Sequence, residues 1–357
     1  MQKKIKVMFY ISTLNIGGAE KVTVTLMRQL NQELFDIYLV LVTEEGALLD
    51  EVPAGVKIIN LDIKRTLFSM IPLRKVIEEV QPDIVYSTLF RTHIAIDLAL
   101  IGLSNKPKTV YMSPTSPKTL LERNELSSWM KFLISKAYKN ADMVLSQTPE
   151  MKDEIAEIHD VPREKIVVFF NPIDTELIDE NIKDCKNPFD SKRINIVGAG
   201  RVSEVKGFDV LIHALKKVLE VNDNFALNIV GRDAGDEQNL KDLAKELGIS
   251  DRVTLWGYQD NLFKFFYHSD LFVLSSRREG LANVVLENMY LNKPIVATKC
   301  VPYYKELLEE KALVPVEDVD ALVKAILGYK ELDIENYSYM EKVPDINKLF
   351  AEVHDNK

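Results

Sequence analysis

The chain has 357 residues, 46% of them hydrophobic, and a formal net charge of -9 at pH 7. This length suits two domains of ordinary size, each with enough apolar residues for its own core. The charge excludes a chain-wide basic surface for nucleic acid, and no apolar run reaches the ~20 residues that a transmembrane helix needs. The two cysteines lack the neighbours of a disulfide framework or a zinc site, which favours a reducing cytoplasm.

The first predicted elements are a buried strand over residues 4–12 and an amphipathic helix that follows a pair of glycines. Gly17 and Gly18 lie at the carboxyl end of that strand, where open α/β sheets bind ligands. A glycine at this place lets the backbone approach a ligand closely. A tight turn that needs small residues explains the pair equally well.

Short β-rich runs alternate with helical patterns along the rest of the chain, which predicts parallel strands joined by crossover helices. The pattern breaks after Asn171 in a polar, proline-containing stretch and restarts near Asn195. We therefore expect two successive α/β domains, over residues 1–173 and 174–337.

A glycine-bounded loop with the sequence GAGRVSEVKGFD follows the first strand of the second domain. Ser203 stands where a dinucleotide-binding fingerprint needs its third glycine, which argues against NAD. Arg201 and Lys206 are suited to hold a diphosphate by charge and hydrogen bonds, although two cations in a loop are usually only solvated. Two further strands end beside Arg232 and Tyr258, where a base and a ribose are expected to bind.

The stretch from Ser275 to Asn292 contains two acids, Glu279 and Glu287, with seven residues between them. An apolar run before it predicts a strand and the apolar spacing after it predicts a helix, so Glu279 is expected in the turn and Glu287 in the helix. Asn283 is expected to cap the helix, whose free N–H groups attract an anion such as phosphate. A strand, turn and helix with two solvated acids fit the same spacing.

Several motifs of this chain occur together in the order typical of one family. They are GGAE at 17–20, NPID at 171–174, GRVSEVKGFD at 200–209, VGRD at 230–233, WGYQDN at 256–261 and EGLANVVLE at 279–287. Over nearly the whole chain they resemble a retaining glycosyltransferase of family 4. The resemblance implies the GT-B fold, in which two Rossmann-like α/β/α domains face a central cleft. It also implies that a C-terminal helix, 338–357, crosses back onto the first domain.

The same resemblance assigns roles to residues of the second domain. Arg201 and Lys206 would neutralise the leaving diphosphate, Glu279 would contact the donor sugar, and Glu287 would accept hydrogen bonds from the ribose hydroxyls. The backbone of the intervening loop would contact sugar and phosphate through Gly280, Leu281, Ala282, Asn283 and Val284. The family needs no metal and no cofactor besides the nucleotide-sugar donor.

One position departs from the family pattern. Many relatives carry a histidine after the strand that is KTVYMS here, but this chain continues with SPTSP. His93 is the nearest candidate to replace it in catalysis, although a lone histidine is more often a positioning or packing residue. In the front-face mechanism that the resemblance implies, the leaving phosphate takes the acceptor proton, so no protein base is required.

Residues 118–139 combine basic residues with large apolar ones, including Trp129 and Phe132. Such a helix could lie on an anionic membrane leaflet, or it could be a surface helix that covers the first sheet. Elsewhere, Asp318 and Asp320 form the one D-x-D pair that a metal-dependent transferase could use. Because a helical pattern follows directly, a helix cap is the better interpretation.

We therefore expect a metal-independent hexosyltransferase of the bacterial cytoplasm, positioned at the inner face of the membrane. It would move a hexose or N-acetylhexosamine from a UDP-linked sugar to a glycan carried on a lipid, in the assembly of capsule, lipopolysaccharide or another polysaccharide. Two alternatives remain, a nucleotide-sugar epimerase of the same fold and a catalytically silent subunit that binds a nucleotide sugar.

Overall fold

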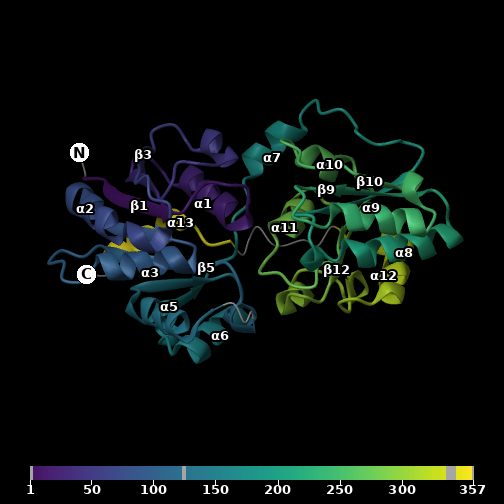
Figure 1. The fold of residues 1–357 in the computed structure, drawn as a ribbon. Coiled ribbons are helices and arrows are strands. Elements are labelled where there is room, and N and C mark those ends of the chain that lie inside the picture. The colour runs from purple at the N-terminus through teal and green to yellow at the C-terminus, as the bar shows by residue number, and fades with distance from the viewer. Residues whose placement is uncertain (1–2, 123–125, 335–342, 356–357) are drawn as a thin grey trace. The chain divides into compact units, whose positions relative to one another are not determined.

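The structure is a computed structural model that describes residues 3–122, 126–334 and 343–355. It divides into two compact units, of which one comprises Met1–Pro172 with Val343–Lys357 and the other Ile173–Lys342. The division lies one residue before the predicted boundary. Each unit is an α/β domain with its own parallel sheet, as Figure 1 shows.

The sheet of the first domain contains seven described strands in the order β3-β2-β1-β4-β5-β6-β7, all parallel. Their bounds are β1 Ile5–Ile11, β2 Phe35–Leu41, β3 Lys57–Asn60, β4 Ile84–Ser87, β5 Lys108–Ser113, β6 Met143–Ser146 and β7 Ile166–Val168. Successive side chains of a strand point to opposite faces, so Val7 and Phe9 enter one core and Met8 and Tyr10 the other.

Helices cover both faces of this sheet. On one side α1 and α13 pack against Val7 and Phe9, and on the other α2, α3, α5 and α6 pack against Met8 and Tyr10. The helices are α1 Gly18–Gln29, α2 Met70–Val80, α3 Phe90–Ala99, α4 Pro117–Glu122, α5 Ser128–Asn140, α6 Pro149–His159 and α13 Ile346–Asp355. The predicted strand and helix at the start of the chain are thus present.

The helix expected over residues 118–139 is interrupted. Helix α4 ends at Glu122 and α5 begins at Ser128, while residues 123–125 lie outside the described part of the chain. Ser127 stands at the N-cap position of α5 with an extended backbone (φ -63°, ψ 154°), a position that serine favours. In the described ranges, no helix combines the length and the apolar composition that a membrane span requires.

The second sheet contains six described parallel strands in the order β10-β9-β8-β11-β12-β13. The strands are β8 Ile194–Ala199, β9 Phe225–Val230, β10 Val253–Leu255, β11 Leu271–Leu274, β12 Ile295–Thr298 and β13 Leu313–Val314. The helices are α7 Thr175–Ile182, α8 Phe208–Val221, α9 Glu237–Glu246, α10 Phe263–His268, α11 Asn283–Tyr290 and α12 Val319–Leu327. Helices α8, α9 and α12 share one core with the sheet, and α10 packs on the opposite face through Phe266 and Phe272.

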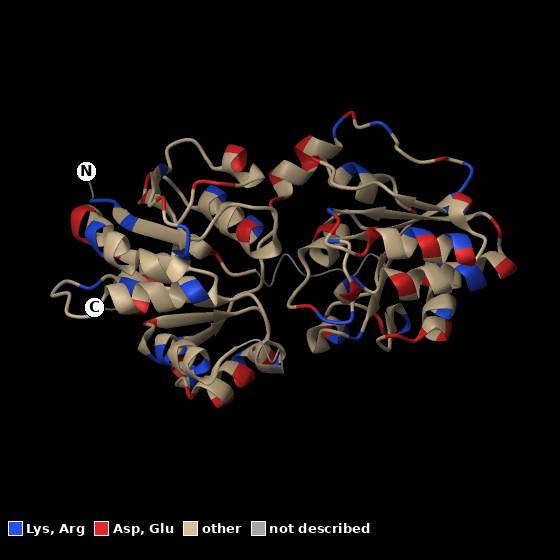
Figure 2. Ribbon diagram, viewed as in Figure 1, with Lys and Arg blue, Asp and Glu red and all other residues tan. Residues whose placement is uncertain are grey.

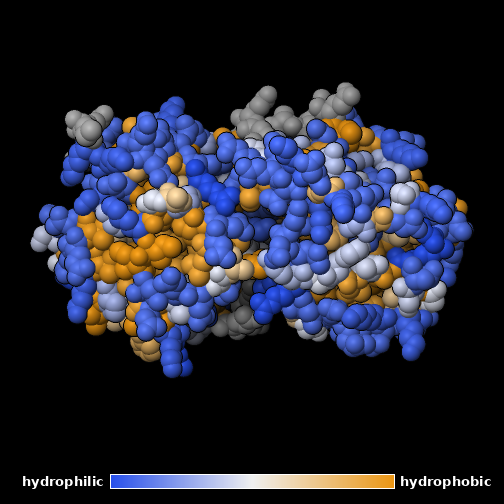
Figure 3. Space-filling model, turned by 90° about the horizontal axis from the view of Figure 1, so that it is seen from above, coloured by the Kyte–Doolittle hydropathy of each residue, from blue (hydrophilic) through white to orange (hydrophobic). Residues whose placement is uncertain are grey.

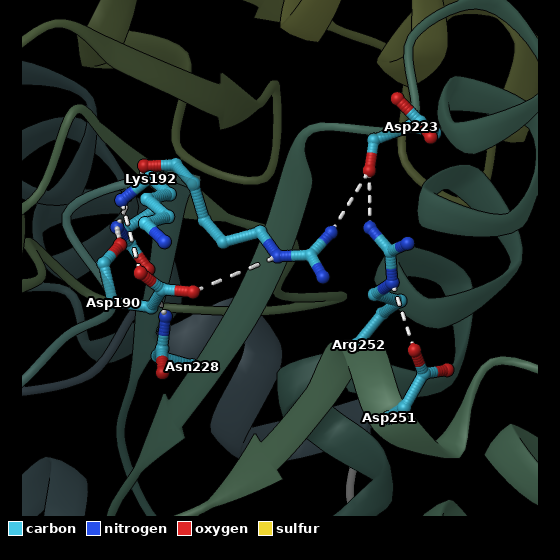
Figure 4. A network of polar contacts seen from close by, with 8 residues as sticks. Asp190, Lys192, Asp223, Asn228, Asp251 and Arg252 are labelled. Carbon is cyan, nitrogen blue, oxygen red and sulfur yellow. Dashed lines mark hydrogen bonds and ion pairs between the residues drawn. The ribbon is translucent and has the colours of Figure 1, made fainter.

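A polar network holds the amino ends of β8, β9 and β10 together (Figure 4). Arg193 and Arg252 both donate hydrogen bonds to the backbone carbonyl of Asp223, at the start of β9. On its other side Arg252 donates to the carboxylate of Asp251, with Nε 2.9 Å from Oδ2. This network lies at the sheet edge opposite to the carboxyl ends of the strands, so it leaves that other edge to the loops that carry the candidate site.

The C-terminal helix α13 belongs to the core of the first domain. Phe350 is fully buried, with its ring 6.3 Å from that of Phe9 and 6.2 Å from that of Tyr86. Asn347 joins the helix to the backbone that follows α1, because its side chain accepts a hydrogen bond from the amide of Asn31 at 2.7 Å. Of the segment predicted to cross back, residues 343–355 therefore pack on the first domain, and 338–342 and 356–357 lie outside the described residues.

We predict that Phe350→Ala lowers the free energy of unfolding of the first domain by about 3–5 kcal/mol, because it leaves a cavity beside the rings of Phe9 and Tyr86. Chemical denaturation measures the change. The exposed Lys348 on the same helix provides the control, and Lys348→Ala is expected to change stability by less than about 0.5 kcal/mol. Equal effects of the two substitutions would show that α13 contributes nothing to that core.

Candidate functional site

The six strands of the second sheet follow the same order as the first six strands of the first sheet, which places a topological switch point in each. In the second sheet the chain proceeds outward from β8 to β9 and β10, then returns to β11 on the other side of β8. Open α/β sheets bind ligands beyond the carboxyl ends of the strands at such a point. The loop after β8 carries Lys206 and the loop after β11 carries Glu279, so the two predicted residues stand at this place.

Lys206 and Glu279 form a close ion pair. Lys206 Nζ lies 2.6 Å from Glu279 Oε1, and the two side chains are only 18% and 15% exposed. Ser276 also donates to Glu279 Oε1, at 2.7 Å. An ammonium group has three donors, so Lys206 can keep this bond and still donate to an oxygen of an anionic ligand.

Two glycines allow the loops after β8 and β11 of the second domain to approach each other closely. Gly207 ends the short helix η4 (Glu204–Lys206) with a φ of +61°, and a Cβ there would lie 2.2 Å from the carbonyl oxygen of Ser275. The backbone of Gly200 (φ +142°) leaves room for the Lys206 side chain, because a Cβ would lie 2.9 Å from Cε. Ser275 Oγ then donates to the carbonyl of Lys206 at 2.9 Å. The geometry of the ion pair is therefore set by backbone contacts between the two loops.

Cys300 lies near the ion pair, after β12. The pKa of its thiol is raised to about 12, mainly by burial and to a smaller extent by the charge of Glu279, although a hydrogen bond with Thr298 and the charge of Lys206 lower it. The thiol is therefore neutral at physiological pH and does not act as a nucleophile. Thr298 Oγ1 donates to the carbonyl of Ser276 at 2.6 Å, which ties β12 to the Glu279 turn.

The loop after Glu279 leads directly into α11. The amide of Ala282 donates to the hydroxyl of the fully buried Tyr304 at 3.3 Å. Ala282 is the N-cap residue and Asn283 the first helical residue, so the prediction that Asn283 caps the helix is wrong by one position. Glu287, on α11, is only 6% exposed, so its side chain is shielded from bulk solvent.

Arg277 holds the loops around the ion pair together. Its guanidinium binds both carboxylate oxygens of Asp209, at 2.9 and 2.8 Å, and donates to Glu317 at 2.7 Å and to the carbonyl of Glu204. The amide of Arg277 donates to the carbonyl of Val205 at 2.8 Å. Burial disfavours the ionised Asp209, but the hydrogen bonds and charge of Arg277 outweigh it, so the pKa of the carboxyl lies below its ordinary value.

The other predicted residues of the second domain follow neighbouring strands. Arg201 comes after β8, Arg232 after β9 and Tyr258 after β10, and all three are exposed. The backbone amide of Val202 donates to the carbonyl of Arg232 at 2.9 Å, which joins the first two loops. Asp233 accepts hydrogen bonds from three successive amides at the start of α9, and these bonds lower the pKa of its carboxyl. Arg201, Arg232 and Tyr258 are therefore presented at the same sheet edge as Lys206.

The glycine pair of the first domain lies after β1, at the switch point of that sheet. Gly17 is the N-cap of α1 with an extended backbone, and neither glycine has a positive φ. A Cβ at Gly18 would have no atom of the described chain within 4 Å. Neither packing within the described chain nor backbone conformation therefore requires glycine at position 18.

His93 follows β4 and lies inside the first domain. It is 1% exposed, stacks on Tyr111 at 4.5 Å, and its Nε2 lies 3.1 Å from the carbonyl oxygen of Ser87. Burial lowers the pKa of the imidazole to about 3, so the ring is neutral. These are the surroundings of a packing residue, and the catalytic assignment of His93 stays a prediction.

The D-x-D pair has the structural role expected of a helix cap. Asp318 accepts a hydrogen bond from the amide of Ala321 at 2.9 Å and so caps α12. Asp320 instead pairs with Lys217, at 2.6 Å. The two carboxylates therefore have separate partners. Within the described ranges, no group of three or more His, Cys, Asp or Glu side chains is placed to hold a metal ion.

Two family models match successive halves of the chain. The model for Glycosyltransferase Family 4 matches residues 16–177, and the model for Glycosyl transferases group 1 matches residues 179–342. The chain belongs to the family 4 glycosyltransferases. The GT-B fold class expected from the motifs is confirmed by the two parallel-sheet domains and by structural neighbours of known fold.

Relatives of known sequence carry glycosyltransferase names. An uncharacterized glycosyltransferase of Methanocaldococcus jannaschii is 33% identical over 245 residues, which are 66% of this chain and 60% of that protein. The N-acetylgalactosamine-N,N'-diacetylbacillosaminyl-diphospho-undecaprenol 4-alpha-N-acetylgalactosaminyltransferase of Campylobacter jejuni is 25% identical over 98% of this chain and 96% of its own. Among solved structures, Anabaena HepE in complex with UDP and glucose has a TM-score of 0.78, with 19% identity over 98% of both chains. That likeness concerns the fold.

The motifs did not reveal how the site is supported. Asp209 and Arg277 are 68 positions apart, and no local spacing links them. The same holds for Tyr304, which lies 22 residues after the amide that it binds. The only sequence signal was indirect, since Asp209 closes the GRVSEVKGFD motif and Arg277 stands two residues before Glu279.

We predict that Arg277→Gln lowers the free energy of unfolding of the second domain by about 1–2 kcal/mol, at the low end for charged hydrogen bonds because the pair is partly exposed. It should also slow sugar transfer, since the loop that carries Lys206 loses its anchor. Chemical denaturation and turnover measure the two effects. The neighbouring exposed Arg278 offers the control, and Arg278→Gln is expected to change neither. A fully active, fully stable Arg277→Gln would contradict the role of this clamp.

Proposed function

We propose that this chain transfers a hexose or N-acetylhexosamine from a UDP-linked sugar to a glycan acceptor, with retention of the anomeric configuration. The observation that carries the proposal is the Lys206–Glu279 pair at the switch point of the second sheet, where one cation and one acid meet beyond the strand ends. The complex of HepE with UDP and glucose supports a UDP-sugar as donor. Retention and metal independence rest on the family resemblance.

In the proposed reaction, the acceptor hydroxyl oxygen forms a bond to the anomeric carbon while the bond from that carbon to the β-phosphate oxygen breaks. The acceptor proton passes to the departing phosphate, so the products are a glycoside and UDP. Lys206 and Arg201 stabilise the negative charge that develops on the diphosphate. The partly buried, preorganised position of Lys206 suits this role, because its ammonium needs no reorganisation as the charge develops.

The acids and the glycine-bounded loop hold the donor in place. Glu279 accepts a hydrogen bond from the sugar, and Glu287 accepts from the ribose hydroxyls. The exposed Arg232 and Tyr258, after the adjacent strands, line the position of the base and ribose. The loop from Gly280 to Val284 contacts sugar and phosphate at the start of α11, where the helix dipole favours negative charge, while the amide of Ala282 donates to Tyr304.

We propose that the acceptor is a glycan carried on a lipid diphosphate and that transfer takes place at the inner face of the cytoplasmic membrane. The name of the Campylobacter relative specifies a diphospho-undecaprenol acceptor. Gly18, which packing leaves unexplained, marks a place in the first domain where a substrate can approach the backbone.

The function is tested by nucleotide release from a panel of nucleotide sugars, in the presence of EDTA, with and without glycan acceptors. We expect UDP release that an acceptor stimulates. Release that is independent of any acceptor would indicate epimerase-like chemistry, and no release from any donor would indicate a silent binding subunit. Activity that appears only when a divalent cation replaces EDTA would refute metal independence.

We predict that Lys206→Ala lowers kcat by about 10²–10³-fold, because the charge developing on the diphosphate loses its preorganised cation. The fold should persist, as measured by circular dichroism and thermal unfolding, since the Gly207–Ser275 backbone contact does not need the side chain. Lys217→Ala, which removes an exposed lysine from the outer face of α8, serves as the control. Near-normal transfer by Lys206→Ala would be incompatible with the mechanism.

A further inference from the structure

Three neighbouring helices of the first domain begin at the edge of the sheet where its strands end. Helices α2, α3 and α5 each precede a parallel strand of the sheet, so each runs antiparallel to the strands and starts at their carboxyl edge. They cover the same face, and α3 lies between α2 and α5. The short helix η2 (Thr66–Ser69) leads into α2, and Thr66 Oγ1 lies 3.0 Å from Oγ of Ser12, just after β1. The start of α2 therefore stands next to the β1 loop that carries the glycine pair.

Four large apolar side chains protrude from these helix starts. Phe68 and Ile71, at η2 and the first turn of α2, are 64% and 62% exposed. Trp129 and Phe132, in the first turn and a half of α5, are 56% and 67% exposed. Exposed hydrophobic residues also occur elsewhere on both domains (Figure 3), so exposure alone does not mark a docking surface.

These four residues differ from the other exposed hydrophobic residues because the segments around them are positively charged. The segments 63–77, 84–96 and 126–141, which contain the three helix starts, include no Asp or Glu. Figure 2 shows the blue residues that α2, α3 and α5 carry in this part of the first domain. The segments contain the cations Lys64, Arg65, Arg74, Lys75, Arg91, Lys131, Lys136 and Lys139. Two of these are paired with acids outside the segments, Arg74 with Glu78 and Lys139 with Asp160.

We propose that the starts of η2, α2, α3 and α5 form a docking surface for an anionic lipid leaflet. Aromatic and aliphatic side chains enter the boundary between head groups and acyl chains, and the surrounding cations bind lipid phosphates. The proposal rests on the proposed function, because a lipid-linked acceptor gives the docking its purpose. It also extends the sequence expectation, which placed the contact on residues 118–139 alone, to α3, which lies beside α5, and to α2, which lies beside α3.

The orientation follows from the helix directions. The helix starts lie at the carboxyl edge of the first sheet, so this edge is turned toward the leaflet when they dock. The β1 loop with Gly17 and Gly18 then lies close to the lipid head groups. An acceptor whose lipid tail stays in the bilayer can therefore present its sugar to that loop. A surface at the opposite ends of the same helices would hold the sugar away from it.

The test is co-sedimentation of the full chain with vesicles of phosphatidylcholine alone or with 30% phosphatidylglycerol. We expect binding to the anionic vesicles only, with a loss of most of the bound fraction when salt rises from 0.05 to 0.5 M. The double variant Phe68→Ser, Trp129→Ser should lower the affinity for anionic vesicles at least tenfold. The double variant Lys64→Glu, Arg65→Glu should lower that affinity by about fivefold or more for each positive charge removed. Val221→Ser with Tyr267→Ser, two exposed apolar residues of the second domain, is the matched control.

A second readout does not depend on disruptive variants. The chain has two tryptophans, and Trp256 is half-buried in the second domain with its Nε1 bonded to Asn228. Anionic vesicles should shift the emission of the wild type to shorter wavelength, and Trp129→Phe should abolish the shift. Equal binding to both vesicle types, no binding, or a shift that persists in Trp129→Phe overturns the proposal. Transfer to a water-soluble acceptor, measured in parallel, separates that failure from a failure of the proposed function.

Discussion

The contact between Gly207 and the carbonyl of Ser275 is the constraint on which the candidate site depends. Because glycine has no Cβ, the loop after β8 and the loop after β11 can touch through their backbones at this point. Lys206 Nζ then lies 2.6 Å from Glu279 Oε1. The Arg277–Asp209 pair holds the same two loops from the other side. A preorganised cation with a partly buried acid beside it is therefore a property of the fold of the second domain.

The two sheets share a topological switch point but carry different side chains there. Each has the strand order of a doubly wound fold, so each brings two loops together at a switch point. In the second domain that point carries charge, which suits a diphosphate. In the first domain it carries Gly17 and Gly18, while His93 is withdrawn into the core. This difference agrees with the proposed roles of the domains. The charged loops of the second would bind the donor, and the glycine loop of the first would leave room for the acceptor.

Much of this could be predicted from the sequence because it depends on local pattern. Alternating strands and helices predicted the two parallel sheets, and the motif order predicted the family. The apolar run before Glu279 and the apolar spacing after it placed that acid in a turn and Glu287 in a helix. The clamp formed by Arg277 could not be predicted, since it joins residues distant in the chain. Asn283 was misplaced because a cap differs from a first helical residue only in backbone dihedrals, which a sequence pattern resolves poorly.

A crystal structure of the protein with UDP bound tests the central claim most directly. The account predicts a diphosphate oxygen within hydrogen-bonding distance of Lys206 Nζ, roughly 2.7–3.2 Å, with Glu287 directed at the ribose. A nucleotide bound away from the β8 and β11 loops, with Lys206 contacting only Glu279, would contradict it.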